Sequence, residues 1–137
     1  MKAFLVLMIS SIILLLAITA RGQTVGQTKQ FSNYTEHHGL VFVSGQIGVT
    51  SKNHQGVGFN EEVNQALKNV SAILKQAGTS VAQVISVTVY LRSLSQFDEF
   101  NNIYKQYFHP PYPARTCVAV SDLVNNANIE ISVIAGK

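Results

Sequence analysis

The chain has 137 residues, of which 47% are hydrophobic and 12% charged, and this length fits a single globular domain. Its single cysteine excludes an intrachain disulfide, so the fold is not a disulfide-stapled one. Setting residues 1–22 aside leaves eight scattered cationic residues against seven acidic ones, and this net charge of +1, without a basic cluster, disfavours nucleic acid as a partner.

Residues 1–22 have the layout of a secretory signal peptide. Lys2 precedes an apolar run of 18 residues over 3–20, and small residues end the segment at Gly22. We therefore expect an exported protein, periplasmic or secreted, whose domain occupies residues 23–137 and does not stay associated with a membrane after cleavage. The alternative is an uncleaved membrane anchor, for which 18 residues is near the lower limit.

The first half of the domain predicts a strand followed by a helix. Residues 40–47 are rich in β-forming side chains, and Gly45 inside them indicates a bulge or a close backbone approach. A helix is predicted from Asn60, which we expect to cap it, to the left-handed position at Gly78. Apolar residues follow at helical spacing along it: Val63, Ala66, Leu67, Val70, Ile73, Leu74 and Ala77.

The second half predicts a strand, a helix and two further strands. Residues 83–91 alternate, with one face formed by Ile85, Val87, Val89 and Leu91. A second helix, starting near Ser95, ends before Pro110 because proline cannot continue it. Residues 114–120 and 128–135 again have strand character.

This order predicts an α+β fold in which two helices cover one face of a mixed β-sheet. The other face carries Thr88, Tyr90, Glu130 and Ile134, which are partly apolar and partly polar. A face of this kind commonly contacts another subunit, and closed cyclic rings are the usual arrangement.

Arg115 is the first candidate for chemistry. It follows the proline-rich segment Pro110–Pro113, which pre-orders the loop, and its planar guanidinium suits a carboxylate held by two hydrogen bonds. The alternative is a surface arginine or a structural ion pair. Cys117 lies on the same strand face as Arg115 and is either a reactive thiol, a small buried side chain, or a residue of which only the backbone matters.

Glu130 is the second candidate, because a carboxylate interrupts an apolar alternation there. It is either exposed on the sheet or partly buried, and a partly buried carboxylate is a candidate general acid or base. Ser44 lies outside any G-x-S-x-G motif, which disfavours a serine hydrolase. The histidines show no metal-ligand spacing, so no metal site is expected: His37, His38, His54 and His109.

Several stretches together resemble the Rid family of reactive-intermediate deaminases, in its order and spacing: "GLVFVSGQIG", "FDEFNNIYKQYF", "PARTCVAV" and "IEISVIA". The resemblance covers residues 29–136. It implies a chorismate-mutase-like α+β fold, a homotrimer, and ligand clefts between neighbouring subunits. It also implies hydrolysis of enamines and 2-imino acids to 2-keto acids and ammonia, by a hydrolase acting on carbon–nitrogen bonds that uses neither metal nor organic cofactor.

The resemblance also assigns roles to residues. Arg115 matches the arginine that binds the substrate carboxylate, and Glu130 matches the carboxylate that orients the attacking water. Cys117 matches a position whose backbone carbonyl helps to hold that water. Ser44 and Gly45 match the strand that lines the cleft.

Two positions depart from the family pattern. Phe31 stands where the family has a substrate-binding tyrosine, so the ring can still pack but the hydroxyl is missing. Gly48 stands where proline is usual, for which we expect an effect on loop stiffness alone. Two alternative functions follow: a non-catalytic trimeric protein that binds small carboxylates, and an RNA-cleaving or translation-inhibiting relative, which the charge pattern disfavours.

Overall fold

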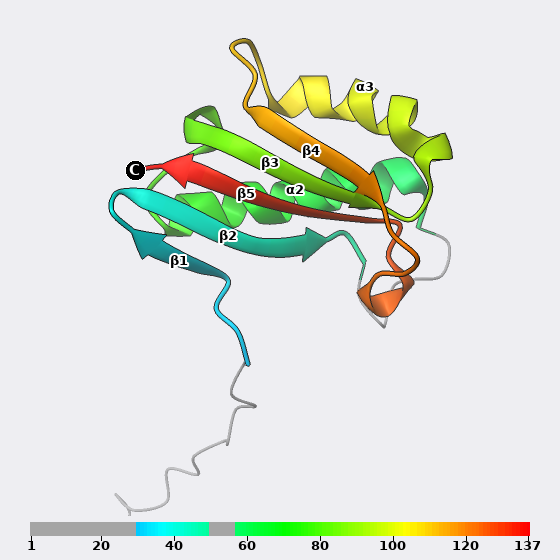
Figure 1. Cartoon of the computed structure of the whole chain (residues 1–137), viewed down its shortest axis with the longest axis horizontal. Coiled ribbons are helices and arrows are strands. Elements are labelled where there is room, and N and C mark those ends of the chain that lie inside the picture. The colour runs from blue at the N-terminus through cyan, green and yellow to red at the C-terminus, as the bar shows by residue number, and fades with distance from the viewer. Residues whose placement is uncertain (1–29, 50–56) are drawn as a thin grey trace, which may run out of the picture. The chain divides into compact units, whose positions relative to one another are not determined.

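The computed structural model describes residues 30–49 and 57–137. These residues form a five-stranded sheet with order β1-β2-β5-β3-β4, in which β3 and β4 are parallel and the other neighbours antiparallel (Figure 1). The prediction of a mixed sheet with two helices is confirmed. The elements are β1 (Tyr34–His37), β2 (Leu40–Ile47), α2 (Phe59–Gln76), β3 (Val84–Leu91), α3 (Phe97–Tyr107), β4 (Ala114–Ala119) and β5 (Ile129–Gly136).

The segment interpreted as a signal peptide, residues 1–22, lies outside the described residues. Within the described part of the chain, no helix has both the length and the apolar character needed to cross a membrane.

The core lies between the sheet and the two helices. Every residue of the apolar stripe predicted for α2 is buried, and the stripe packs against alternating buried side chains of β2, β3 and β5. Gly78 adopts φ +77° just after α2, and Thr79 donates a hydrogen bond to the Leu74 carbonyl across this turn. Gly78 therefore ends the helix as predicted.

Two local predictions are wrong. Gly58 precedes the first turn of α2 and no side chain caps it, so Asn60 lies inside the helix instead of capping it. In β3, a register shift between Val84 and Ser86 places Val84 in the core and leaves Ile85 52% exposed. The bulge adds one residue, so Val84 takes the core position that we predicted for Ile85, whereas Val87, Val89 and Leu91 face the core as predicted.

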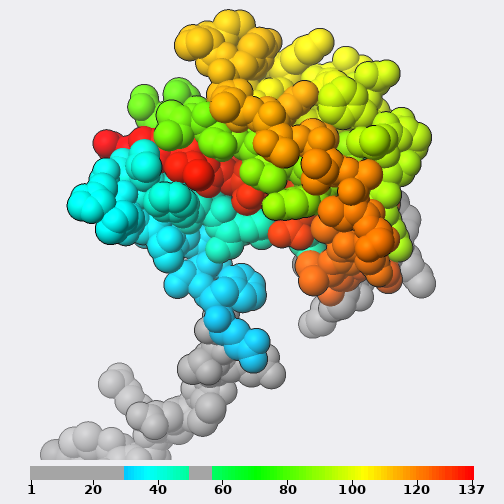
Figure 2. Space-filling view, viewed as in Figure 1, coloured from blue at the N-terminus to red at the C-terminus, as the bar shows by residue number. Residues whose placement is uncertain are grey.

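The opposite face of the sheet is not covered by any helix of the described chain. In the view of Figures 1 and 2 the strands lie in front, with α2 behind them, so their side chains form the visible surface. A hollow of about 230 Å³ on this face is lined by Phe42, Val43, Ser86, Thr88, Ser132, Val133 and Ile134. We call this surface the open face.

Candidate functional site

The pairing of β4 with β3 fixes the direction of Arg115. Arg115 lies opposite Val87 and Cys117 opposite Val89, and both valines are buried under the helices. Because side chains of paired residues project from the same face of a sheet, Arg115 and Cys117 project toward α3.

The Arg115 guanidinium lies over three aromatic rings of α3. Its central carbon is 4.6 Å from the Tyr104 ring centroid, 5.5 Å from that of Phe100 and 5.7 Å from that of Phe97. These distances are within the range of cation–π attraction. Among the described residues, no hydrogen-bond acceptor or acidic side chain pairs with this guanidinium. The rings therefore hold the cation while its hydrogen-bond donors stay free.

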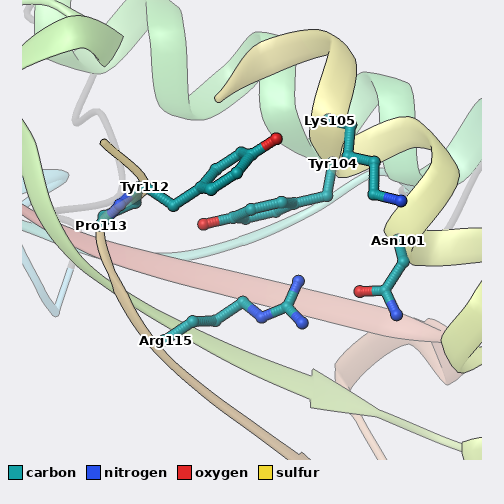
Figure 3. Close-up of a pocket in the computed structure, with 6 residues that line it drawn as sticks. All are labelled: Asn101, Tyr104, Lys105, Tyr112, Pro113 and Arg115. Carbon is teal, nitrogen blue, oxygen red and sulfur yellow. The ribbon is translucent and has the colours of Figure 1, made fainter. Parts of the chain in front are cut away.

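This guanidinium lines a cavity of about 380 Å³ between α3 and the start of β4 (Figure 3). The Tyr104 hydroxyl points toward Tyr112 and Pro113, is buried, and has no hydrogen-bond partner within the described residues. Burial raises the pKa of Tyr104, against the opposing effect of the Arg115 charge. The lining residues are Asn101, Tyr104, Lys105, Tyr112, Pro113 and Arg115.

Cys117 lies at the margin of the core and is half-buried. Burial raises the pKa of its thiol, and the neighbouring Arg115 charge lowers it by a smaller amount. The thiol is therefore protonated at neutral pH, and a protonated thiol is a poor nucleophile. We call Arg115, Cys117 and the three rings the arginine side.

Glu130 lies on the open face, where it pairs with Tyr90. A register shift between Val43 and Gln46 brings the backbone of Gly45 against the Glu130 side chain, and a Cβ on Gly45 would overlap the carboxylate. The predicted bulge or close approach at Gly45 is thus confirmed, and the missing side chain makes room for the carboxylate.

Ser44, next to Gly45, anchors the segment before β1. Its hydroxyl donates to the Ser32 carbonyl at 2.7 Å, and its backbone N–H donates to the Asn33 carbonyl at 3.0 Å. Phe31 begins this segment and is 65% exposed in the single chain. We call Glu130, Gly45, Ser44 and Phe31 the glutamate side.

A buried glutamate of α2 fixes the start of β5. Glu62 accepts hydrogen bonds from the Asn128 backbone at 2.6 Å, the Asn128 side chain at 2.8 Å and the Ile129 backbone at 3.3 Å. These bonds hold the strand immediately before Glu130. A Cβ on Gly48 would overlap the Glu62 backbone, so Gly48 serves this close approach, and the expectation of an effect on loop stiffness alone is wrong.

The two sides do not meet within one chain, because they project from opposite faces of the sheet. The sequence identified Arg115 and Cys117 of the arginine side but not its three rings. It identified all four members of the glutamate side, and it did not show that the two sides are separated. It also missed Asn101 and Lys105, although their spacing of four residues places them on one face of α3.

The fold and these two sides define a class of protein. It is an α+β protein with an arginine that forms no ion pair on one face of its sheet and, on the other face, a glutamate whose carboxylate lies against a glycine. Within residues 30–49 and 57–137, no group of three histidine, cysteine or acidic side chains is arranged to hold a metal ion.

Comparison with known proteins gives the family. Residues 22–137 match the family described as Endoribonuclease L-PSP. A RutC family protein of Aquifex aeolicus is 41% identical over 78% of this chain and 88% of its own length. Human 2-iminobutanoate/2-iminopropanoate deaminase is 42% identical over 69% of this chain and 71% of its own length.

Comparison with solved structures gives similar folds. Yeast Mmf1 superposes with a TM-score of 0.74 at 35% identity, covering 80% of this chain and 89% of that one. TdcF of E. coli, in a crystal structure with bound serine, gives 0.72 at 33% identity, covering 82% and 91%. The chain belongs to the Endoribonuclease L-PSP family, which includes the Rid proteins that its sequence resembles.

Proposed function

We propose that this protein hydrolyses enamines and 2-imino acids to 2-keto acids and ammonia. The observation that carries the proposal is the Arg115 guanidinium, which three rings hold in place while its donors remain unpaired. A planar fork of free donors beside a cavity is suited to a substrate carboxylate.

The separation of the two sides supports a homotrimer with its sites between subunits. A substrate bound to Arg115 needs a carboxylate nearby to activate water, and Glu130 of the same chain lies on the other face. A closed head-to-tail arrangement sets different surfaces of neighbouring chains against each other. It brings the arginine side of one subunit to the glutamate side of the next, with the open faces directed inward.

The reaction needs no covalent intermediate with the protein, because the imine carbon is already electrophilic. Glu130 accepts a proton from a water molecule as the water oxygen bonds to the C=N carbon. Glu130 returns that proton to the nitrogen to give the carbinolamine. The hydroxyl proton of the carbinolamine then passes to the same nitrogen as the C–N bond breaks, which releases ammonia and leaves the keto group. Arg115 binds and orients the substrate through its carboxylate, and the backbone carbonyl of Cys117 helps to hold the water.

Two relatives support this reaction class. The human relative is named for 2-iminobutanoate and 2-iminopropanoate, and the E. coli structure contains serine, which carries the same α-carboxylate. Phe31 supplies a ring to the cleft without the hydroxyl of a tyrosine. We keep the prediction that the protein is exported and that residues 1–22 are its signal peptide.

The test measures keto-acid formation by purified residues 23–137. An amino-acid oxidase generates the 2-imino acid in situ, and semicarbazide competes for it. We expect faster keto-acid formation with the protein, and a loss of about 100-fold or more in Arg115→Ala, because the carboxylate anchor is removed. Arg92→Ala is the matched control, since Arg92 pairs with Asp122 on the surface.

Two other outcomes contradict the proposal. A folded trimer that accelerates none of several imino acids points to the carboxylate-binding protein. Ribonuclease activity, which the family description raises, counts only if it persists through purification and is lost in Arg115→Ala.

A further inference from the structure

A second cation lines the same cavity as Arg115. Lys105 follows Asn101 by one helical turn of α3, so both side chains project from one face. In Figure 3 the Lys105 ammonium points toward the Asn101 side chain, which lies beside the Arg115 guanidinium. Lys105, Asn101 and Arg115 therefore border one continuous space.

This space has two positive charges and no negative one among its lining residues. Within the described residues, the salt bridges join Arg92 to Asp122 and Lys137 to Glu36, and neither includes a cation of the cavity. Asn101 and Asn102 occupy the positions four and three residues before Lys105, where an acidic residue would pair with it on the helix surface.

The helix alone explains part of this arrangement. Lys105 lies in the last turn of α3, where a cation interacts favourably with the helix dipole. The dipole does not account for the position of this side chain at the Arg115 cavity, where an anion bound between the two exposed cations would offset their mutual repulsion.

We propose that Lys105 binds a second carboxylate, so that the preferred substrates are 2-imino acids that carry an acidic side chain. Resting on the proposed function, this inference deepens it by naming the substrate class. Arg115 takes the α-carboxylate, Lys105 takes the side-chain carboxylate, and the Asn101 amide lies between them. A cavity of about 380 Å³ is within the size range of small-molecule sites.

The test compares two imino acids of equal length, generated by oxidases from glutamate and from norvaline. The first carries two carboxylates and the second carries one. We expect Lys105→Met to lower kcat/KM for the glutamate-derived substrate about five- to tenfold and to change it less than about twofold for the other. Lys75→Met, in the last turn of α2, is the control and should change neither.

The outcomes separate this inference from the proposed function. Hydrolysis of the norvaline-derived substrate with no preference for the other, or with equal effects of Lys105→Met on both, overturns the dicarboxylate inference and leaves the deaminase standing. If neither imino acid is hydrolysed, the deaminase proposal fails. The dicarboxylate inference is then tested by a binding measurement.

Binding is measured by calorimetry with glutarate, pentanoate and inorganic phosphate. The inference predicts that glutarate binds about fivefold or more tighter than pentanoate, and that Lys105→Met removes the difference. Equal binding of glutarate and pentanoate overturns it. Phosphate binding as strong as that of glutarate also overturns it, because the cavity would then bind any dianion.

Discussion

The arginine side and the glutamate side are built in different ways. On the arginine side, a long cationic side chain lies on aromatic rings that α3 supplies. On the glutamate side, the missing side chain of Gly45 leaves space for the carboxylate, and the Glu62 carboxylate holds the backbone of the strand before Glu130. The difference indicates that a packed helix positions the group that we propose binds substrate, whereas the course of the strands positions the group that we propose handles protons.

Among substitutions that leave Arg115 and Glu130 in place, the largest effect is expected from Gly45→Ala. The new Cβ would overlap the Glu130 carboxylate, and this flexible end of the side chain must move away. We expect kcat to fall about 100-fold while the thermal midpoint changes by only a few degrees. Steady-state kinetics and thermal unfolding of the same preparation check this.

Gly136→Ala is the matched control, because a Cβ there meets its nearest atom at 3.9 Å in ordinary van der Waals contact. Full activity in Gly45→Ala would show that the position of the Glu130 carboxylate does not matter for the reaction.

An intermediate effect, on stability, is expected from Tyr104→Phe. The ring under Arg115 is kept, whereas a buried hydroxyl without a partner in the described chain is removed. We expect the free energy of unfolding to rise by about 0.5–1 kcal/mol, with unchanged KM. Urea unfolding measures it. A loss of stability would show that the hydroxyl has a partner in the assembled protein.

The smallest effect is expected from Cys117→Ser, because the proposed role of this residue lies in its backbone. Activity should stay within about threefold of that of the unchanged protein. Since burial raises the thiol pKa, alkylation by iodoacetamide should continue to accelerate with rising pH beyond the range in which an exposed thiol levels off. A folded but inactive Cys117→Ser protein would instead assign the chemistry to the thiol.

Much of the fold was predictable because its strongest patterns are periodic. The apolar stripe of α2 and the alternating apolar residues of β5 follow from sequence spacing alone. The side chains of the stripe and every second side chain of β5 are buried in the structure. The strand β1 was missed because residues 34–37 are mostly polar. It pairs with β2 as a hairpin, with His37 opposite Leu40, whereas its ion pair between Glu36 and Lys137 depends on a residue distant in sequence.

The site was predictable residue by residue but not in its arrangement. Arg115 and Glu130 stand out from their strands by charge, and the family resemblance gave them roles. Their separation follows from the parallel pairing of β4 with β3, which sequence spacing does not reveal. The bulge between Val84 and Ser86 exposes Ile85. It could not be predicted from the sequence, because no glycine or proline marks it.

The central claim is that each site joins the arginine side of one chain to the glutamate side of another. It is tested most directly by mixing two inactive proteins, Arg115→Ala and Glu130→Gln, in equal amounts and refolding them together into mixed trimers. With random assembly, about one quarter of the clefts between chains combine an intact Arg115 with an intact Glu130. The account predicts that about one quarter of the original deaminase activity returns, and mixed trimers that remain inactive would contradict it.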